Sequence, residues 1–144
     1  MNKVSSILAR KGNAAISVSP DTPVVDALKI MAEKNIGSVM VMQDGNYLGI
    51  LTERDYSRKV VIKERNSTDT KVSEIMSTDL PSVNPDDTIE HCMELMTTRN
   101  IRYMPVFTGT KLEGIISMSD VVKETILSQK ETITHLQSYI HSNS

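Results

Sequence analysis

The apolar and polar positions of the chain follow the same pattern twice. Residues 17–58 and 82–123 align without a gap at an offset of 65, and eleven of the 42 aligned positions are identical. Each copy is too short to bury a stable core alone, so we expect the two copies to pack together and to form two related clefts. Apolar residues recur at helical spacing in both copies, at Val24, Ala27, Leu28 and Met31 and again at Ile89, Cys92, Met93 and Met96.

Within each copy the pattern predicts the order strand, helix, strand, strand, helix. The first helix is expected to end at Asn35 or Asn100, because asparagine tolerates a left-handed C-terminal conformation. The last strand leads into a second helix that begins near Thr52 or Ser117. The expected fold class is therefore α/β (α+β), with one domain at 1–65 and a second at 71–130 whose final helix extends to about 142.

Local signals refine this outline. Asp21 or Thr22 is expected to cap the first helix of copy one, and Asp86 or Asp87 its counterpart in copy two. Asp44-Gly45 predicts a tight hairpin between two strands.

The repeat also extends upstream of the aligned block. Lys3–Leu8 resembles Lys71–Met76, and we call these two stretches the leading segments. A polar connector, 64–70, precedes the second of them.

The final helix of copy two carries an apolar seam with alternating steps of four and three residues. Such a seam can pack on its own domain or against a second subunit, and the spacing alone does not separate the two. Its members are Val122, Ile126, Gln129, Ile133, Leu136 and Ile140.

Composition narrows the classes of function. A net charge of −2 argues against nucleic acid or an anionic membrane as the main partner. The single Cys92 cannot form an internal disulfide and is expected to be a small buried residue, and the nine methionines are expected in the core. No leader sequence or long apolar run is evident, so we expect a cytoplasmic protein. The three histidines show neither a metal-ligand spacing nor a nucleophile–base set, so we expect no enzyme and no metal site.

The sharpest motif occurs twice, as Gly49–Asp55 and Gly114–Asp120. Each copy ends a strand with a hydroxyl residue, Thr52 or Ser117, and places an aspartate three residues later. This spacing is that of a helix capping box, in which the acid binds a backbone amide. The same geometry can present a hydroxyl and a carboxylate to the 2′ and 3′ hydroxyls of a ribose.

Two such units resemble a pair of CBS domains (cystathionine-β-synthase domains) over nearly the whole chain. Further matches are Asn35-Ile36, Asn100-Ile101 and Met104-Pro105-Val106. The resemblance implies a Bateman module, a pseudo-twofold pair that binds AMP, ADP, ATP, NAD(H) or S-adenosylmethionine in clefts between the repeats. It also implies a homodimer.

The resemblance assigns roles to particular residues. Thr52, Asp55, Ser117 and Asp120 would hold ribose hydroxyls, and Arg54, Arg58 and Arg102 would contact phosphates. The adenine pocket would comprise Ile16, Ser17, Val18, Ile36, Ser38, Val39, Met40, Ser82, Val83, Ile101, Tyr103, Met104 and Pro105.

The two expected sites are chemically unequal. Gly37 aligns with Arg102, and Arg54 aligns with Ser119, so we expect one tight site and one weak or empty site. The expected function is a regulatory module for energy or redox sensing that binds an adenosine nucleotide and signals to an unidentified protein. The alternative is a dimeric scaffold that binds no nucleotide and uses the aspartates only as helix caps.

Overall fold

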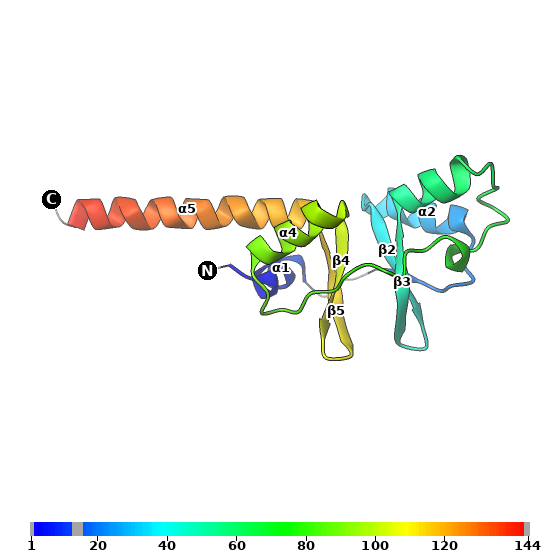
Figure 1. Ribbon diagram of the computed structural model, residues 1–144, viewed down its shortest axis with the longest axis horizontal. Coiled ribbons are helices and arrows are strands. Elements are labelled where there is room, and N and C mark those ends of the chain that lie inside the picture. Colours follow the sequence, from blue (N-terminus) through cyan, green and yellow to red (C-terminus); the bar gives the residue numbers. More distant parts are fainter. Residues whose placement is uncertain (1, 13–15, 143–144) are drawn as a thin grey trace. The chain divides into compact units, whose positions relative to one another are not determined.

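The chain forms two compact units in the computed structural model, which describes residues 2–12 and 16–142. Residues 16–80 make the first-repeat unit, and residues 2–12 together with 81–142 make the second-repeat unit. Each unit pairs a small sheet with helices (Figure 1). The mixed α/β fold class predicted from the pattern is therefore confirmed.

The elements of the two units correspond closely, except that the first strand predicted for copy two does not form among the described residues. Val83 makes only an isolated parallel bridge with Val106 there. The first-repeat unit contains β1 (Ser17–Val18), α2 (Val24–Lys34), β2 (Ser38–Gln43), β3 (Asn46–Thr52), α3 (Glu53–Tyr56), a π-helical turn (Ser57–Val61) and a 3-10 turn (Val72–Glu74). The second-repeat unit contains α1 (Val4–Lys11), α4 (Ile89–Arg99), β4 (Tyr103–Thr108), β5 (Lys111–Ser117) and α5 (Met118–Ser142). The second helix of each copy begins at Glu53 or Met118, as predicted.

The leading segments are exchanged between the repeats. Val4 and Ile7 of α1 precede copy one in sequence, yet they belong to the apolar core of the second-repeat unit and are 0% and 2% exposed. Val72 and Ile75 precede copy two and are buried to the same extent in the core of the first-repeat unit. Each unit is therefore completed by a segment that the sequence places ahead of the other repeat.

Local sequence explains how α2 and α4 end. Asn35 and Asn100 adopt φ of 55° and 53° in the left-handed region, as predicted for these positions. The predicted N-caps are wrong. Pro23 occupies the cap position of α2 without a side-chain hydrogen bond, and Thr88 caps α4 by accepting a bond from the amide of His91. In both cases the capping position lies closer to the first apolar residue than the aspartates do.

Both hairpins follow from their turn residues. Asp44 and Gly45 have φ of 51° and 79°, and they connect β2 to β3 by the two-residue turn that suits antiparallel strands. Gly109 occupies the same place between β4 and β5 with φ of 61°. The resulting register aligns Ser38 with Thr52 and Tyr103 with Ser117, so each motif lies at the open end of its hairpin.

Cys92 confirms its predicted place in the core of the second-repeat unit. The side chain is fully buried. Burial raises the pKa of the Cys92 thiol to about 11, and the negative charge of Asp87 acts in the same direction. The thiol therefore stays protonated and unreactive at neutral pH.

The buried residues described in helix α5 lie in its first half. The helix packs against α4, α1 and β5, and Val121 and Glu124 are fully buried there. From Gln129 to His141 every residue is exposed, and Figure 1 shows this part extending beyond the other elements of the unit. Among the described residues, no helix is long and apolar enough to cross a membrane.

The exchange predicts that a leading segment stabilises the other repeat. Ile75→Ala removes a buried side chain from the core of the first-repeat unit, and we expect the free energy of unfolding to fall by about 2–5 kcal/mol. The matched control is Ile62→Ala in the same unit, where the side chain is 71% exposed. Its effect in the same denaturant titration should stay within about 0.5 kcal/mol. Equal effects of the two substitutions would contradict the exchange.

Candidate functional site

Thr52 and Asp55 form a reciprocal capping box at the start of α3. The Thr52 hydroxyl accepts a hydrogen bond from the Asp55 amide at 3.1 Å, and Asp55 Oδ2 accepts one from the Thr52 amide at 3.0 Å. The Thr52 hydroxyl also lies 3.0 Å from the same carboxylate oxygen and donates to it. The motif therefore performs the structural role that its spacing predicts.

The other oxygen of Asp55 is occupied as well. Oδ1 accepts a hydrogen bond from the Ser77 hydroxyl at 2.8 Å and lies 3.0 Å from the Lys59 ammonium. Asp55 is only 4% exposed. The four donors are the Thr52 amide, the Thr52 hydroxyl, the Ser77 hydroxyl and the Lys59 ammonium. A carboxylate has about four acceptor positions, so those of Asp55 are filled. A ribose could bind it only by displacing one of these partners.

The backbone around Asp55 is equally tight. Ile50 and Ser77 exchange two backbone hydrogen bonds, of 3.0 and 2.8 Å, which hold the chain that follows the second leading segment against β3. A Cβ atom on Gly49 would lie 2.7 Å from the Ser77 carbonyl oxygen. The neighbouring backbone therefore requires a glycine at position 49.

Ser117 and Asp120 repeat the capping box at the start of α5, in a more open setting. The Ser117 hydroxyl accepts from the Asp120 amide at 3.1 Å, and Asp120 Oδ2 accepts from the Ser117 amide at 2.8 Å. Lys11 of α1 donates to the same oxygen at 2.9 Å. The Asp120 side chain is 20% exposed, and its contacts with the Ser117 amide and with Lys11 both lie on Oδ2 rather than Oδ1.

The lysines at both motifs were not identified from the sequence. Lys59 binds Asp55 and donates to the Ile75 carbonyl, whereas Lys11 binds Asp120 and donates to the Ile115 carbonyl, all at 2.9–3.0 Å. Each carboxylate thus helps to fix an exchanged leading segment. Lys59 lies four residues after Asp55, which is a local helical signal, but Lys11 is distant in sequence and gives none.

An ion pair between a buried glutamate and an exposed arginine adds to the asymmetry of the units. Glu124 is fully buried and pairs with Arg10 of α1, and Asn2 donates to its other oxygen. In the aligned repeats Glu124 occupies the position of Lys59. The two motifs therefore share backbone geometry but have side chains of opposite charge one helical turn further on.

The residues predicted to form an adenine pocket divide into buried residues and residues that are exposed or half-buried. Val18 and Val39 belong to one core cluster and Val83 and Met104 to the other, so their side chains are used for packing. Met40 and Pro105 are also buried, but strand alternation places them on the opposite face from Val39 and Met104. The exposed or half-buried members are Ile16, Ser17, Ile36, Ser38, Ser82, Ile101 and Tyr103.

The predicted phosphate contacts differ in exposure. Arg54 is half-buried, whereas Arg58 and Arg102 are exposed. The Arg102 carbonyl accepts a 2.8 Å hydrogen bond from the amide of Met118, which places this residue beside the first turn of α5. In the first repeat, the Gly37 carbonyl accepts the corresponding hydrogen bond from the amide of Glu53 at 3.2 Å. An arginine, Arg102, therefore lies beside the helix start that carries Asp120, whereas a glycine, Gly37, lies beside the helix start that carries Asp55.

Residues typical of metal sites are dispersed. Within residues 2–12 and 16–142, no group of three or more histidine, cysteine, aspartate or glutamate side chains is placed to hold a metal ion.

The chain belongs to the CBS-domain family, since the family model named "CBS domain" matches residues 4–62 and 72–126. It is 34% identical to the mitochondrial CBS domain-containing protein CBSX3 of Arabidopsis thaliana, over 95% of this chain and 71% of that protein. A CBS-domain protein of Burkholderia ambifaria has a similar solved structure, with a TM-score of 0.84, 43% identity, and coverage of 89% of this chain and 96% of that one.

A more distant structure shares the fold. The CBS domain pair of protein MJ0100 has a TM-score of 0.76 at 22% identity, over 90% of this chain and 98% of that one. It was solved in complex with 5′-methylthioadenosine and S-adenosyl-L-methionine. The resemblance to CBS pairs inferred from the repeated motif is therefore confirmed.

The partners of the two aspartates predict different structural costs of removal. Asp55→Ala removes a cap together with contacts to Ser77 and Lys59, and we expect a loss of about 2–4 kcal/mol in the free energy of unfolding. Asp120→Ala removes a cap and an exposed ion pair, and we expect about 1–2 kcal/mol. Denaturant titrations measure both. A larger loss at Asp120 would mean that the carboxylate contacts are ranked wrongly.

Proposed function

We propose that the chain is a regulatory module that binds an adenosine nucleotide or a related adenosyl compound and transmits the binding to a partner protein. The observation that carries the proposal is the partly exposed carboxylate of Asp120, whose contacts with Ser117 and Lys11 lie on Oδ2, in a chain of the CBS family. A fixed and partly exposed acceptor suits a pair of adjacent sugar hydroxyls.

Positive charge near Asp120 supports an anionic ligand. Arg102 is exposed beside the first turn of α5, and the first amides of a helix favour negative charge. The bound adenosyl compounds of MJ0100 support the choice of ligand class, although at 22% identity that structure gives the fold and not the ligand of this chain. AMP, ADP and ATP remain our first candidates, followed by NAD(H) and S-adenosylmethionine.

The unequal carboxylates refine the expectation of unequal sites. Asp55 is buried and has four partners, whereas Asp120 is partly exposed. We therefore assign the tighter binding to the motif with Asp120 and the weak or empty site to the motif with Asp55. The contribution of Arg54, Arg58 and the adenine-pocket residues follows the family resemblance alone.

A scaffold without a nucleotide is the second candidate. It is favoured by the same capping boxes, because each carboxylate already stabilises a helix start and a leading segment. In this case the module would act through protein contacts only. The homodimer, the regulated protein, a cytoplasmic location and the absence of catalysis all stay predictions.

Calorimetry with AMP, ATP, NADH and S-adenosylmethionine distinguishes the two candidates. We expect at least one compound to bind with a Kd below about 1 mM, and Asp120→Ala to weaken it roughly 10- to 150-fold because one acceptor of a hydrogen bond is lost. Asp86→Ala is the matched control, since it removes an exposed carboxylate from the same unit. Failure of all four compounds to bind would favour the scaffold, and unchanged binding to Asp120→Ala would exclude the assigned ribose contact.

Transmission to a partner predicts a change in α5. Asp120 lies in the first turn of this helix, so a ligand held there should slow amide exchange along its length. Hydrogen exchange measured with and without the bound compound tests this. Protection confined to the residues around Asp120 would show binding without transmission through α5.

A further inference from the structure

The outer half of α5 is exposed along its length. Every residue from Gln129 to His141 is exposed, whereas the buried residues Val121 and Glu124 lie in the preceding turns. An isolated helix of this length is marginal in water, because the cost of nucleation is recovered only by long or packed helices. Some surface must therefore stabilise this half of α5.

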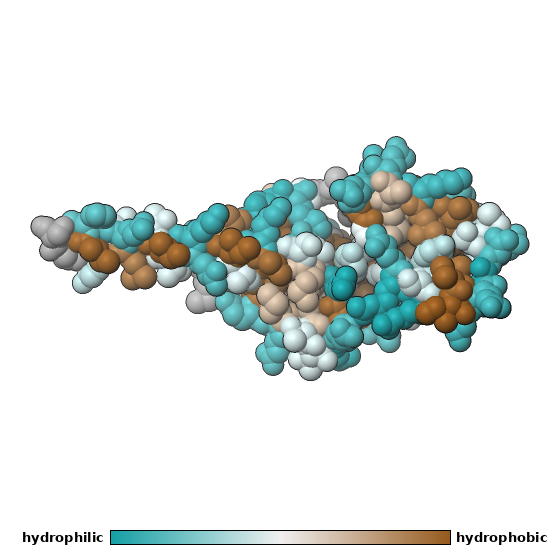
Figure 2. Space-filling view, turned by 90° about the horizontal axis from the view of Figure 1, so that it is seen from above, coloured by the Kyte–Doolittle hydropathy of each residue, from teal (hydrophilic) through white to brown (hydrophobic). Residues whose placement is uncertain are grey.

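The exposed apolar side chains of α5 lie along one line. Val122, Ile126, Ile133, Leu136 and Ile140 are between 43% and 63% exposed, and together with Gln129 they follow steps of four and three residues. Figure 2 shows the brown apolar residues in a row along the helix, with hydrophilic residues beside them. A narrow stripe with this heptad spacing is the seam of a coiled coil and not the broad face that covers a core.

We propose that α5 pairs with α5 of a second copy of the chain as a parallel two-stranded coiled coil. The two alternating seam positions differ in residue type: one set is Ile126, Ile133 and Ile140, and the other is Val122, Gln129 and Leu136. β-Branched isoleucine at the first position and leucine at the second favour two parallel strands. The inference is independent of the nucleotide.

Gln129 distinguishes parallel from antiparallel pairing. In a parallel pair in register, its amide meets the same amide of the other copy, and the two can hydrogen-bond. In an antiparallel pair that aligns the same seam, Gln129 faces the partner's Ile133, and a buried amide is left without a partner. Burying an unpaired polar group is unfavourable, so the parallel arrangement is favoured.

The charged residues beside the seam also favour parallel pairing. Lys123 and Lys130 flank one side, whereas Thr125, Thr132 and Tyr139 flank the other. Parallel strands place each lysine opposite a neutral residue of the other copy. Antiparallel strands place Lys130 opposite the partner's Lys130, and two like charges at this distance repel.

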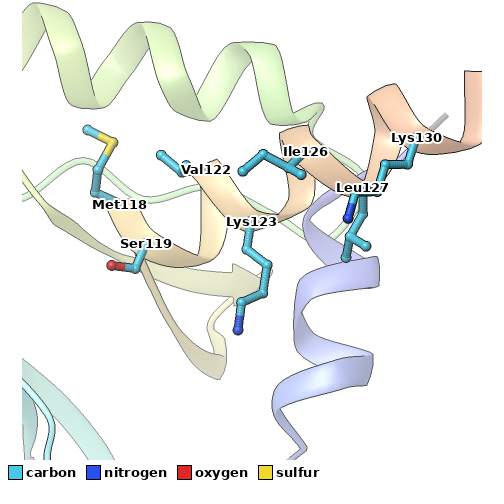
Figure 3. Close-up of a pocket in the computed structure, with 7 residues that line it drawn as sticks. All are labelled: Met118, Ser119, Val122, Lys123, Ile126, Leu127 and Lys130. Carbon is cyan, nitrogen blue, oxygen red and sulfur yellow. The ribbon is translucent and has the colours of Figure 1, made fainter. Parts of the chain in front are cut away.

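The body of the unit leaves the start of the seam accessible. Met118, Val122 and Ile126 line an open pocket along α5. In Figure 3 they project from one side of the helix, whereas Lys123 points to the other. The seam can therefore begin at Val122 and continue to Ile140, a length of about 27 Å at the rise of an α-helix.

A charge placed in the seam tests the proposal. Wild-type chain should be a dimer by sedimentation equilibrium at about 100 µM, and Ile133→Glu should raise the dimer Kd by roughly 100-fold or more, because two carboxylates would be buried against each other. Ile133 is 54% exposed, so the fold of the monomer should be unaffected. The matched control is Ser138→Glu, which adds the same charge on the opposite face and should leave the dimer intact.

The outcomes separate clearly. A monomeric wild type overturns the proposal, as does a dimer that survives Ile133→Glu. Equal dissociation by Ile133→Glu and Ser138→Glu would show an effect of net charge and would also overturn it.

A single cysteine tests the orientation. Ile140→Cys places a thiol at the far end of the seam, where only parallel strands bring the two copies together, and the native Cys92 is buried. Mild oxidation should give a disulfide-linked dimer on a non-reducing gel. A dimer by sedimentation that forms no such link would overturn the parallel arrangement.

Discussion

The exchange of the leading segments is the constraint on which both units depend. A chain of this size built from two repeats could have closed each repeat on itself. Instead Val4 and Ile7 complete the core beside copy two, and Val72 and Ile75 complete the core beside copy one. The polar contacts of the motifs follow from this exchange, because Lys11 and Ser77, which bind the two aspartates, come shortly after the exchanged segments in the chain. The same exchange therefore completes the two apolar cores and positions the polar groups around Asp55 and Asp120.

The two aspartates show how far one motif can diverge in its surroundings. Both caps have the same backbone hydrogen bonds, within 0.2 Å of each other. Asp55 is enclosed by four partners, whereas Asp120 is partly exposed. A capping role and a binding role are compatible for a carboxylate only where it remains accessible. Both aspartates therefore cap a helix, whereas the proposed binding of a sugar rests on Asp120 alone.

Local features of the fold could be predicted, and non-local ones could not. The helices, their ends at Asn35 and Asn100 and the turn at Asp44-Gly45 depend on neighbours in sequence, and these predictions are confirmed. The caps at Asp21 or Thr22 failed because the chain enters α2 through Pro23. The repeat in the sequence identified the leading segments, but it did not predict which core they join. A pattern of apolar residues shows that a segment is buried and does not show against which repeat it packs. For the same reason the motif predicted both carboxylates, and only the structure separated a saturated one from a partly exposed one.

The length of α5 makes it a lever arm. Its 25 residues form one uninterrupted rod that starts beside the Asp120 carboxylate. At the rise of an α-helix such a rod spans about 37 Å, so a tilt of about 5° at its base would swing the tip by about 3 Å. Small displacements near the first turn are thereby magnified at the far end, where a neighbouring molecule could detect them.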